Sequence, residues 1–310
     1  MIMSTLIVIT GPTGVGKTNI SLQLAEKFGC PIISADSRQF YRELKIGTAA
    51  PSEEELQRVT HYFIGTHSIF DEYNAGQYEE DVIVLLDELF QKHSVVLLVG
   101  GSMMYVDAVC NGLDNIPTVD VETRRFWQKE YAAKGLEFIQ NELRRLDEKH
   151  YNEVDLKNPK RILHALEICT MTGNPYSNLR TGERKKRNFE ILKIGLNLPR
   201  PELYERINRR VDQMMEAGLL EEASQFYPHK HLNTLNTVGY KEIYAFMDGE
   251  WDIETAIGMI KQNSRRYAKR QLTWYNRDAE INWFRPDDEK SIMDLITSQL
   301  QIKDNGPIIN

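Results

Sequence analysis

Residues 11–18 constrain the fold of this chain more than any other segment. They are Gly11, Pro12, Thr13, Gly14, Val15, Gly16, Lys17 and Thr18, a complete match to the phosphate-binding pattern G-x-x-x-x-G-K-[ST]. Glycines allow consecutive backbone N–H groups to turn toward phosphate oxygens, and a helix that follows presents its N-terminus to the same anion. Lys17 would add a positive charge, and the Thr18 hydroxyl would ligate Mg²⁺. The motif predicts a binding site for a di- or triphosphate.

The sequence around this motif alternates between strand and helix patterns. Short apolar runs predict strands at 6–9, 31–34, 62–64, 95–99 and 191–198. Apolar residues at helical spacing predict helices at 20–28, at 78–91, after Pro201 and at 254–276. Continuous apolar strands that alternate with helices indicate a parallel sheet covered on both faces.

The pattern changes between residues 119 and 187, where the periodicity is helical and strand-like runs are missing. Asn158 and Pro159 are typical of an N-cap followed by proline at the first helical position. Strand character returns near residue 188. We therefore predict an α/β fold in which residues 1–118 and 188–310 form a parallel-sheet core like that of P-loop NTPases. Residues 119–187 would form a mostly helical insertion domain.

Composition adds a few limits. The 310 residues include 38 basic and 45 acidic ones, and the net charge of −7 argues against indiscriminate nucleic-acid binding without excluding a local basic surface. Cys30, Cys110 and Cys169 are odd in number and far apart, which suits a reduced compartment. No apolar run approaches the roughly 18–20 residues that span a membrane. We expect a cytoplasmic monomer without a membrane partner.

The apolar strand at 95–99 helps to choose among phosphate-binding proteins. It ends in Gly100, Gly101 and Ser102. Motor and switch NTPases place an acidic residue in this strand to hold the metal ion. The sequence therefore favours a small-molecule kinase or a transferase that uses a diphosphate.

Several short motifs together indicate a family. Asp36, Ser37, Arg38 and Gln39 directly follow the second predicted strand, and residues 267–274 read Tyr-Ala-Lys-Arg-Gln-Leu-Thr-Trp. With the phosphate motif, the turn at 100–102 and the Gly239-Tyr240 pair, these segments resemble the bacterial tRNA dimethylallyltransferases, also called tRNA isopentenyltransferases. The resemblance runs from about residue 5 to residue 277, which is nearly the whole chain.

The resemblance implies an activity and a donor. Members of this family transfer a dimethylallyl group from its diphosphate to N6 of the adenosine on the 3′ side of the tRNA anticodon, at position 37. The phosphate motif would then hold dimethylallyl diphosphate with Mg²⁺, not ATP. Lys17, Thr18 and Arg206 would stabilise the leaving diphosphate, and Arg210 would be a further ligand. Asp36 would be the general base that activates the adenosine nitrogen.

The arginines after Pro201 have a competing explanation. Glu202 stands four residues before Arg206, and Glu205 stands four residues before Arg209. Such spacing on a helix favours surface ion pairs, which would occupy both arginines and leave neither for a ligand.

The resemblance also implies a set of tRNA contacts. Those near the adenosine are Asp36, Ser37, Arg38, Gln39 and Ser102. Those on the insertion are Arg124, Lys160, Arg161 and His164, and those on the C-terminal part are Gly239, Tyr240, Lys269, Arg270, Gln271 and Trp274. Basic side chains interleaved with aromatic ones suit phosphate contacts and stacking on unpaired bases. Gln39 would read a base edge through both of its amide atoms.

The sequence departs from the family pattern in places. Ser102 stands where threonine is usual and keeps the hydroxyl. Met103 and Met104 stand where Gly-Leu is usual, and we expect both to pack in the core because methionine fills irregular gaps. Lys160 and His164 stand where glutamine and arginine are more common.

Three other functions agree with parts of the sequence. Prenyl transfer to free AMP would need neither a helical insertion nor a basic C-terminal helix. A small-molecule P-loop kinase would consume the γ-phosphate of ATP, with Asp36 binding an acceptor hydroxyl. An RNA-binding chaperone with a vestigial phosphate motif would bind tRNA equally well after Lys17→Ala.

Overall fold

The computed structural model describes residues 4–304. In this part of the chain, six strands form one parallel sheet in the order β3-β2-β4-β1-β5-β6. The strands are β1 (Thr5–Thr10), β2 (Ile32–Ser34), β3 (His61–Tyr62), β4 (Val95–Val99), β5 (Glu190–Leu196) and β6 (Asn282–Phe284). The predicted α/β class with a parallel sheet is confirmed. The strand expected at 62–64 is shorter, since Phe63 adopts a φ of 63° that ends the extended backbone.

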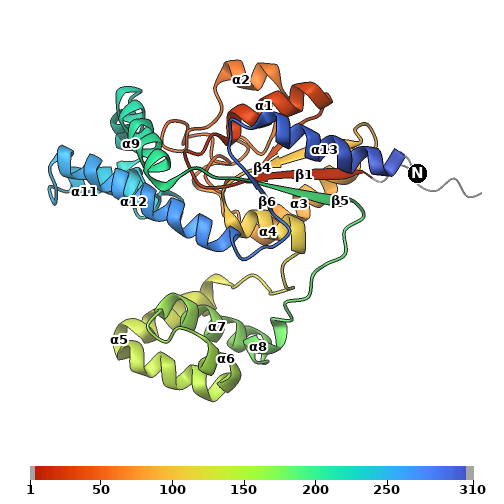
Figure 1. Cartoon of the computed structure of the whole chain (residues 1–310). Helices are drawn as coiled ribbons and strands as arrows, with labels where there is room; N and C mark the ends of the chain where they lie inside the picture. The colour runs from red at the N-terminus through yellow and green to blue at the C-terminus, as the bar shows by residue number, and fades with distance from the viewer. Residues whose placement is uncertain (1–3, 305–310) are drawn as a thin grey trace, which may run out of the picture. The chain divides into compact units, whose positions relative to one another are not determined.

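Helices cover both faces of the sheet, as Figure 1 shows. On one face, Ile7 and Ile9 of β1 pack with α1 (Lys17–Phe28) and α13 (Glu289–Asp304). On the other face, Leu6 and Val8 pack with α3 (Ala75–Leu89) and α4 (Met103–Asn111). The alternation along β1 follows from the two-residue period of a strand, and it leaves β1 buried on both sides.

Four more helices extend this core. They are α9 (Arg200–Glu216), α10 (Leu219–Gln225), α11 (Tyr240–Met247) and α12 (Ile253–Tyr275). Leu203 and Ile207 of α9 join the same apolar cluster as α1. The predicted long helix after Pro201 and the basic helix at 254–276 are both confirmed to within a residue or two.

The carboxyl ends of the parallel strands lie along one edge of the sheet, where ligands bind in folds of this kind. The phosphate motif follows β1, Asp36 follows β2, and Gly100 follows β4. These loops approach closely, because a Cβ atom on Gly100 would lie 2.2 Å from the Ala35 carbonyl oxygen. Thr10 Oγ1 donates a hydrogen bond to the Gly100 carbonyl at 3.2 Å. The topology thus gathers the motifs of the sequence into one region.

Within residues 4–304, five helices of the core are not predicted by the apolar pattern, and α10, α11 and α13 are three of them. Of the other two, α2 (Glu53–Arg58) begins with a capping box in which Ser52 and Glu55 exchange hydrogen bonds. The second, α4, starts at Met103. The expectation that both methionines pack in the core is wrong for Met104, which is 57% exposed, while Met103 packs against the apolar cluster.

Residues Asn111–Lys185 form a separate compact unit. Its helices are α5 (Val121–Leu146), α6 (Glu148–Glu153), α7 (Pro159–Thr172) and α8 (Tyr176–Leu179), and α5 is interrupted at Gly135, where φ is 80°. Asn158 accepts from the Arg161 N–H and caps α7 as expected. The unit starts at residue 111 rather than 119 and ends at 185 rather than 187, because the extended segment before α5 groups with these helices.

None of the helices between residues 4 and 304 combines the length and apolar composition that a membrane crossing requires.

Candidate active site

The phosphate motif forms the wall of a cavity of about 410 Å³. Gly14 and Gly16 adopt φ angles of 77° and 110°, which favour glycine, and Gly16 directly precedes α1. The cavity is lined by Thr13, Gly14, Gly16, Lys17, Thr18, Asp36, Gln39, Thr48, Ala49, Gly101, Arg206, Arg209, Arg210, Gln213, Tyr267 and Gln271. Four arginine and lysine side chains in one cavity with a helix N-terminus suit a polyanionic ligand.

Lys17 is folded back over the motif. Its Nζ donates to the carbonyl oxygens of Gly11 and Pro12, both at 3.0 Å. The pKa of Lys17 is lowered to about 8, mainly by burial and also by the nearby Arg210, while Asp36 opposes both effects. An anionic ligand that reaches this amine would restore the charged form, so Lys17 is suited to respond to diphosphate binding.

We expect the affinity for inorganic pyrophosphate to fall as the pH rises through about 8. Lys17 is protonated below this pKa and loses its charge above it, so the attraction to the anion weakens on the alkaline side. Calorimetric titration from pH 7 to pH 9.5 measures the effect. Pyrophosphate itself titrates, so the comparison is with Lys17→Met, which should lack the additional decline. A wild-type profile parallel to that of the variant would contradict the assignment.

A second cavity, of about 330 Å³, adjoins the first and shares Asp36 with it. Besides Asp36, its lining includes Ser37, Arg38, Gly47, Thr48, Met214, Asn236, Thr237, Val238, Gly239, Lys241, Ser264, Tyr267 and Arg270. Five residues line both cavities: Thr13, Asp36, Thr48, Arg210 and Tyr267. The carboxylate therefore stands where a group bound to the phosphate motif meets a group bound in the second cavity.

The Asp36 carboxylate is oriented by its own turn. Oδ1 accepts from the Arg38 N–H at 2.9 Å, an arrangement typical of an Asx turn. Among the hydrogen bonds of the described residues, none involves Oδ2 of this side chain. One oxygen is thus fixed by the backbone and the other is left for a ligand.

Ser102 orders the residue next to Asp36. Its Oγ accepts from the Ser37 N–H at 2.9 Å and donates to the Ser37 Oγ at 3.1 Å, and only 6% of Ser102 is exposed. The predicted contact of Ser102 with a nucleotide is therefore replaced, in this structure, by a contact that shapes the loop carrying Asp36.

Gln39 has a similar internal role, which differs from the predicted reading of a base edge. Its Oε1 accepts from the Ser34 hydroxyl at 3.1 Å, and its Nε2 donates to the carbonyl oxygens of Thr48 at 3.4 Å and Ala49 at 3.1 Å. Ala49 has a φ of 45°, a conformation that needs such support. Both ends of the amide hold the loop at 48–49, so bidentate base reading would require breaking these bonds.

Tyr240 is fully buried, so its side chain cannot contact tRNA in this arrangement. Its hydroxyl donates to Glu222 at 2.6 Å. The same carboxylate accepts from the backbone N–H groups of Lys45, Ile46 and Gly47 at distances of 2.8–2.9 Å. Tyr240 therefore supports the loop that closes the second cavity, while Gly239 lines that cavity directly.

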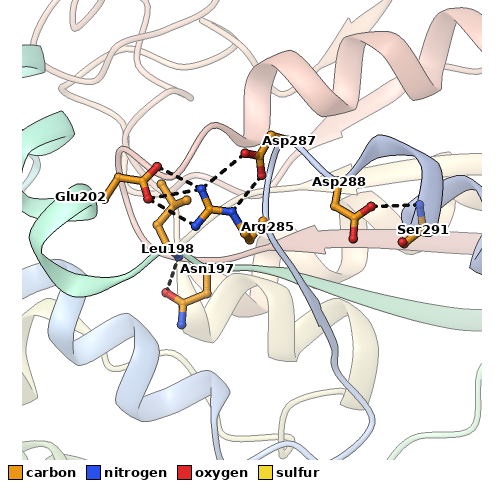
Figure 2. A network of polar contacts seen from close by, with 7 residues as sticks. All are labelled: Asn197, Leu198, Glu202, Arg285, Asp287, Asp288 and Ser291. Carbon is orange, nitrogen blue, oxygen red and sulfur yellow. Dashed lines mark hydrogen bonds and ion pairs between the residues drawn. The ribbon is translucent and has the colours of Figure 1, made fainter.

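The competing explanation for the α9 arginines holds for only one of them. Glu202 pairs with Arg285, as Figure 2 shows, and the two charged groups are 3.3 Å apart. Among the ion pairs of the described residues, none joins Glu202 to Arg206. Glu205 does pair with Arg209, at 2.8 Å. Arg206 lines the phosphate cavity, with an Nη2 atom 3.1 Å from the position that a Cβ on Gly16 would take.

Arg210 lies deeper in the site than Arg206. Its Nη1 donates to the Thr13 hydroxyl at 3.4 Å, and burial lowers its pKa from the usual value while Asp36 raises it. Arginine stays charged even so, and a partly buried guanidinium beside a phosphate motif is suited to bind an anion.

These contacts predict different effects when each of two neighbouring arginines is replaced by alanine. Arg206→Ala should weaken pyrophosphate binding about tenfold, because a charge-assisted contact to the ligand is lost. Arg209 also lines the phosphate cavity, but its side chain is 66% exposed and is paired with Glu205, so Arg209→Ala should change binding less than about twofold. Calorimetric titration of both variants measures the difference, and equal losses would contradict the placement of Arg206.

Two residues that line both cavities, Tyr267 and Thr48, have no predicted role, although Tyr267 begins the 267–274 motif. Burial raises the pKa of Tyr267 to about 12, with Asp36 adding to the effect. Tyr267 and Gln271 stand four residues apart on α12, which places them on one helix face, so helical spacing could have identified Tyr267.

The exposed side of α12 carries the predicted basic and aromatic residues. Lys269 and Arg270 are exposed, and Trp274 is 37% exposed. The Trp274 Nε1 donates to Asp107 at 2.8 Å, and the Arg277 guanidinium lies 5.9 Å from the ring centroid. An anchored indole with a partly open face is suited to stack on a base.

The remaining predicted contacts lie on the helical unit. Lys160 and Arg161 are exposed at the start of α7. His164 lies 3.9 Å from Glu167, and burial, with Arg124 nearby, lowers the pKa of the imidazole. His164 is therefore largely neutral near pH 7, so Arg124, Lys160 and Arg161 supply the positive charge of this cluster.

The residues of the phosphate cavity could supply a small number of oxygen ligands to a bound Mg²⁺. Thr18 and Asp36 offer oxygen atoms in the same cavity. In the part of the chain that the structure describes, no group of three or more His, Cys, Asp or Glu side chains could hold a metal ion. Mg²⁺ keeps several waters and is commonly held by one or two protein oxygens together with substrate phosphates, which agrees with this set.

Comparison with known proteins identifies the relatives of this chain. The family model described as IPP transferase matches residues 39–278. The chain is 59% identical over 301 residues to tRNA dimethylallyltransferase 1 of Bacteroides fragilis, covering 97% of this chain and all of that protein. It is 50% identical over 296 residues to a tRNA dimethylallyltransferase of Christiangramia forsetii, covering 95% of this chain and 98% of that one.

Solved structures give the same result. The tRNA isopentenylpyrophosphate transferase of Bacillus halodurans is 35% identical, with a TM-score of 0.71 over 97% of this chain and 98% of that chain. A eukaryotic dimethylallyltransferase acting on tRNA is 26% identical, with a TM-score of 0.79 over 99% of this chain and 81% of that chain. Relatives at this identity over nearly the full length establish the relationship, and the chain belongs to the IPP transferase family, among the tRNA dimethylallyltransferases.

Proposed function

We propose that this chain transfers the dimethylallyl group of dimethylallyl diphosphate to N6 of the adenosine on the 3′ side of a tRNA anticodon. The observation that carries the proposal is the position of Asp36, which lines both the phosphate cavity and the cavity beside it. A carboxylate at such a junction can act on an acceptor nitrogen while the donor is held by the phosphate motif.

The phosphate cavity is suited to the leaving group. As the allylic C–O bond breaks, the electron pair stays on the diphosphate, and negative charge accumulates there. Lys17, Arg206 and Arg210 would stabilise that charge together with backbone N–H groups of the motif. Mg²⁺ bound at Thr18 and the donor oxygens would neutralise part of the same charge.

The second cavity is suited to the acceptor. The N6 amine of adenosine is a poor nucleophile because its lone pair is delocalised into the purine. Asp36 would accept the N6 proton as the N–C bond forms, which leaves a neutral secondary amine and free diphosphate. Tyr267 and Arg38 line the same cavity and would surround the base.

Surfaces outside the cavities favour tRNA over a free nucleotide as the acceptor. The exposed residues of α12 and the basic cluster at the start of α7 offer positive charge that a mononucleotide would not use. An adenosine stacked in an anticodon loop must leave the stack to reach Asp36, which is most favourable in a single-stranded loop.

A substrate competition experiment tests the proposal. Purified protein is mixed with labelled dimethylallyl diphosphate, Mg²⁺ and equal concentrations of unmodified tRNA and AMP, without ATP. We expect the label on tRNA. Label on AMP would assign the chain to the nucleotide-modifying prenyltransferases, and absence of label with turnover of ATP would favour the kinase alternative.

A further inference from the structure

Gln271 joins three separate parts of the site from the buried side of α12. Its Oε1 accepts from the Thr13 N–H of the phosphate motif at 2.8 Å. Its Nε2 donates to the Gly101 carbonyl oxygen, also at 2.8 Å. The side chain is 1% exposed, so both amide atoms are used inside the protein. The predicted contact of the Gln271 side chain with tRNA would require breaking these hydrogen bonds.

The Gln271 amide lies close to residues of the phosphate cavity. A Cβ on Gly101 would lie 2.4 Å from the Gln271 Nε2 and 3.5 Å from the Lys17 Nζ. Thr13 also receives a hydrogen bond from Arg210 on its hydroxyl. The amide therefore fixes the backbone of the motif at the residue that Arg210 contacts, close to the lysine that would meet the anion.

Other, exposed positions of the same helix carry predicted tRNA contacts. Lys269 and Arg270 immediately precede Gln271 and are exposed, as is Trp274 further along. One helix thus presents charged residues to solvent and holds the phosphate motif with a neutral amide on its buried side.

We propose that Gln271 is a positioning residue for the donor diphosphate and makes no contact with tRNA. Its acceptor oxygen holds the Thr13 N–H, its donor nitrogen holds the turn after β4, and together they keep the motif in a shape that accepts two linked phosphates. The identity of the donor rests on the proposed function, whereas the anion-binding role is testable with inorganic pyrophosphate alone.

Two substitutions separate the role of the amide from its volume. Gln271→Met keeps the size and loses both hydrogen bonds, and pyrophosphate affinity should fall about fivefold. Gln271→Glu keeps an acceptor for Thr13 but loses the bond to Gly101 and adds a negative charge near Lys17. The pyrophosphate affinity of Gln271→Glu should therefore fall further than that of Gln271→Met. The difference between the two variants should be larger at low salt, where the added negative charge is less screened. Calorimetry at two salt concentrations gives the order.

Two further measurements show whether a variant binds pyrophosphate more weakly only because it is unfolded. The thermal midpoint of each variant is recorded, and hydrogen exchange of the Thr13 amide is compared with that of β1. Gln271→Met should accelerate exchange at Thr13 while β1 keeps its protection. Lys269→Ala, on the exposed side of α12, is the matched control and should leave pyrophosphate binding unchanged while weakening tRNA binding.

The binding of pyrophosphate and tRNA by the Gln271 variants decides whether the inference holds. Weaker pyrophosphate binding with unchanged tRNA binding in the Gln271 variants supports the inference. Unchanged pyrophosphate binding, or equal losses for both ligands, overturns it. A wild-type protein that binds pyrophosphate but transfers no prenyl group would refute the proposed function and leave this inference intact.

Discussion

Asp36→Asn should lower the rate of prenyl transfer to tRNA by about 10²- to 10⁴-fold, the range that a positioned general base contributes. Asparagine keeps the size of the side chain and can still accept from the Arg38 N–H through its amide oxygen, so the turn should persist. It cannot take the N6 proton. Affinity for dimethylallyl diphosphate should not fall, because the substitution removes a negative charge beside Lys17 and Arg210.

Single-turnover transfer at saturating tRNA measures this loss, and calorimetry measures donor affinity in the same protein. Asp87→Asn is the matched control, since Asp87 is exposed on α3 and lines neither cavity. Full activity in Asp36→Asn, with donor bound normally, would remove Asp36 from the mechanism.

Lys17→Met should reduce kcat/KM for the donor by about 10²- to 10³-fold, the usual loss when a charge-stabilising group is removed from an active site. The effect should appear in both binding and the chemical step, because negative charge on the diphosphate increases as the allylic bond breaks. Thermal stability should not fall, since burial disfavours the charged amine in the free protein.

Steady-state kinetics with varied dimethylallyl diphosphate test this expectation, with tRNA affinity as the internal control. The tRNA dissociation constant should stay within about twofold of the wild-type value because Lys17 lines the phosphate cavity and not the exposed side of α12. An unchanged kcat/KM would support the alternative of a vestigial phosphate motif.

The sequence predicted the elements whose local signals are strong. The phosphate motif, the apolar strand at 95–99 and the helix after Pro201 all lie where expected, because glycine patterns and apolar periodicity are set by neighbours in the chain. The parallel sheet then places the ends of β1, β2 and β4 together. Asp36, to which the family resemblance assigned the role of general base, accordingly lines the same cavity as Lys17.

The roles of the buried polar residues could not be predicted in this way. Gln271 and Thr13 are 258 residues apart in the sequence, and the hydrogen bond between them depends on how α12 packs. Gln39 and Tyr240 are polar and lie in family motifs, which suggests ligand contacts, yet both stabilise loops around the cavities. A motif identifies the region of a site, whereas the partner of each side chain follows from tertiary packing.

The exposed methionine and the arginine pairs illustrate the same limit. Met104 looks like a core residue by type, but its helix begins one residue earlier and turns it to solvent. Glu202 looks like a partner for Arg206 by helical spacing, but it pairs with Arg285, which lies 83 residues away. Local spacing gave a correct pair only for Glu205 and Arg209.

The most direct test of the central claim, that Asp36 brings a diphosphate donor and a tRNA adenosine together, is the position of the transferred group. Labelled dimethylallyl diphosphate and Mg²⁺ are incubated with the protein and two tRNA transcripts that differ only in carrying adenosine or guanosine on the 3′ side of the anticodon, without ATP. The account predicts label at N6 of that adenosine in the first transcript and none in the second. Equal labelling of both transcripts, or label only when ATP is added, would contradict it.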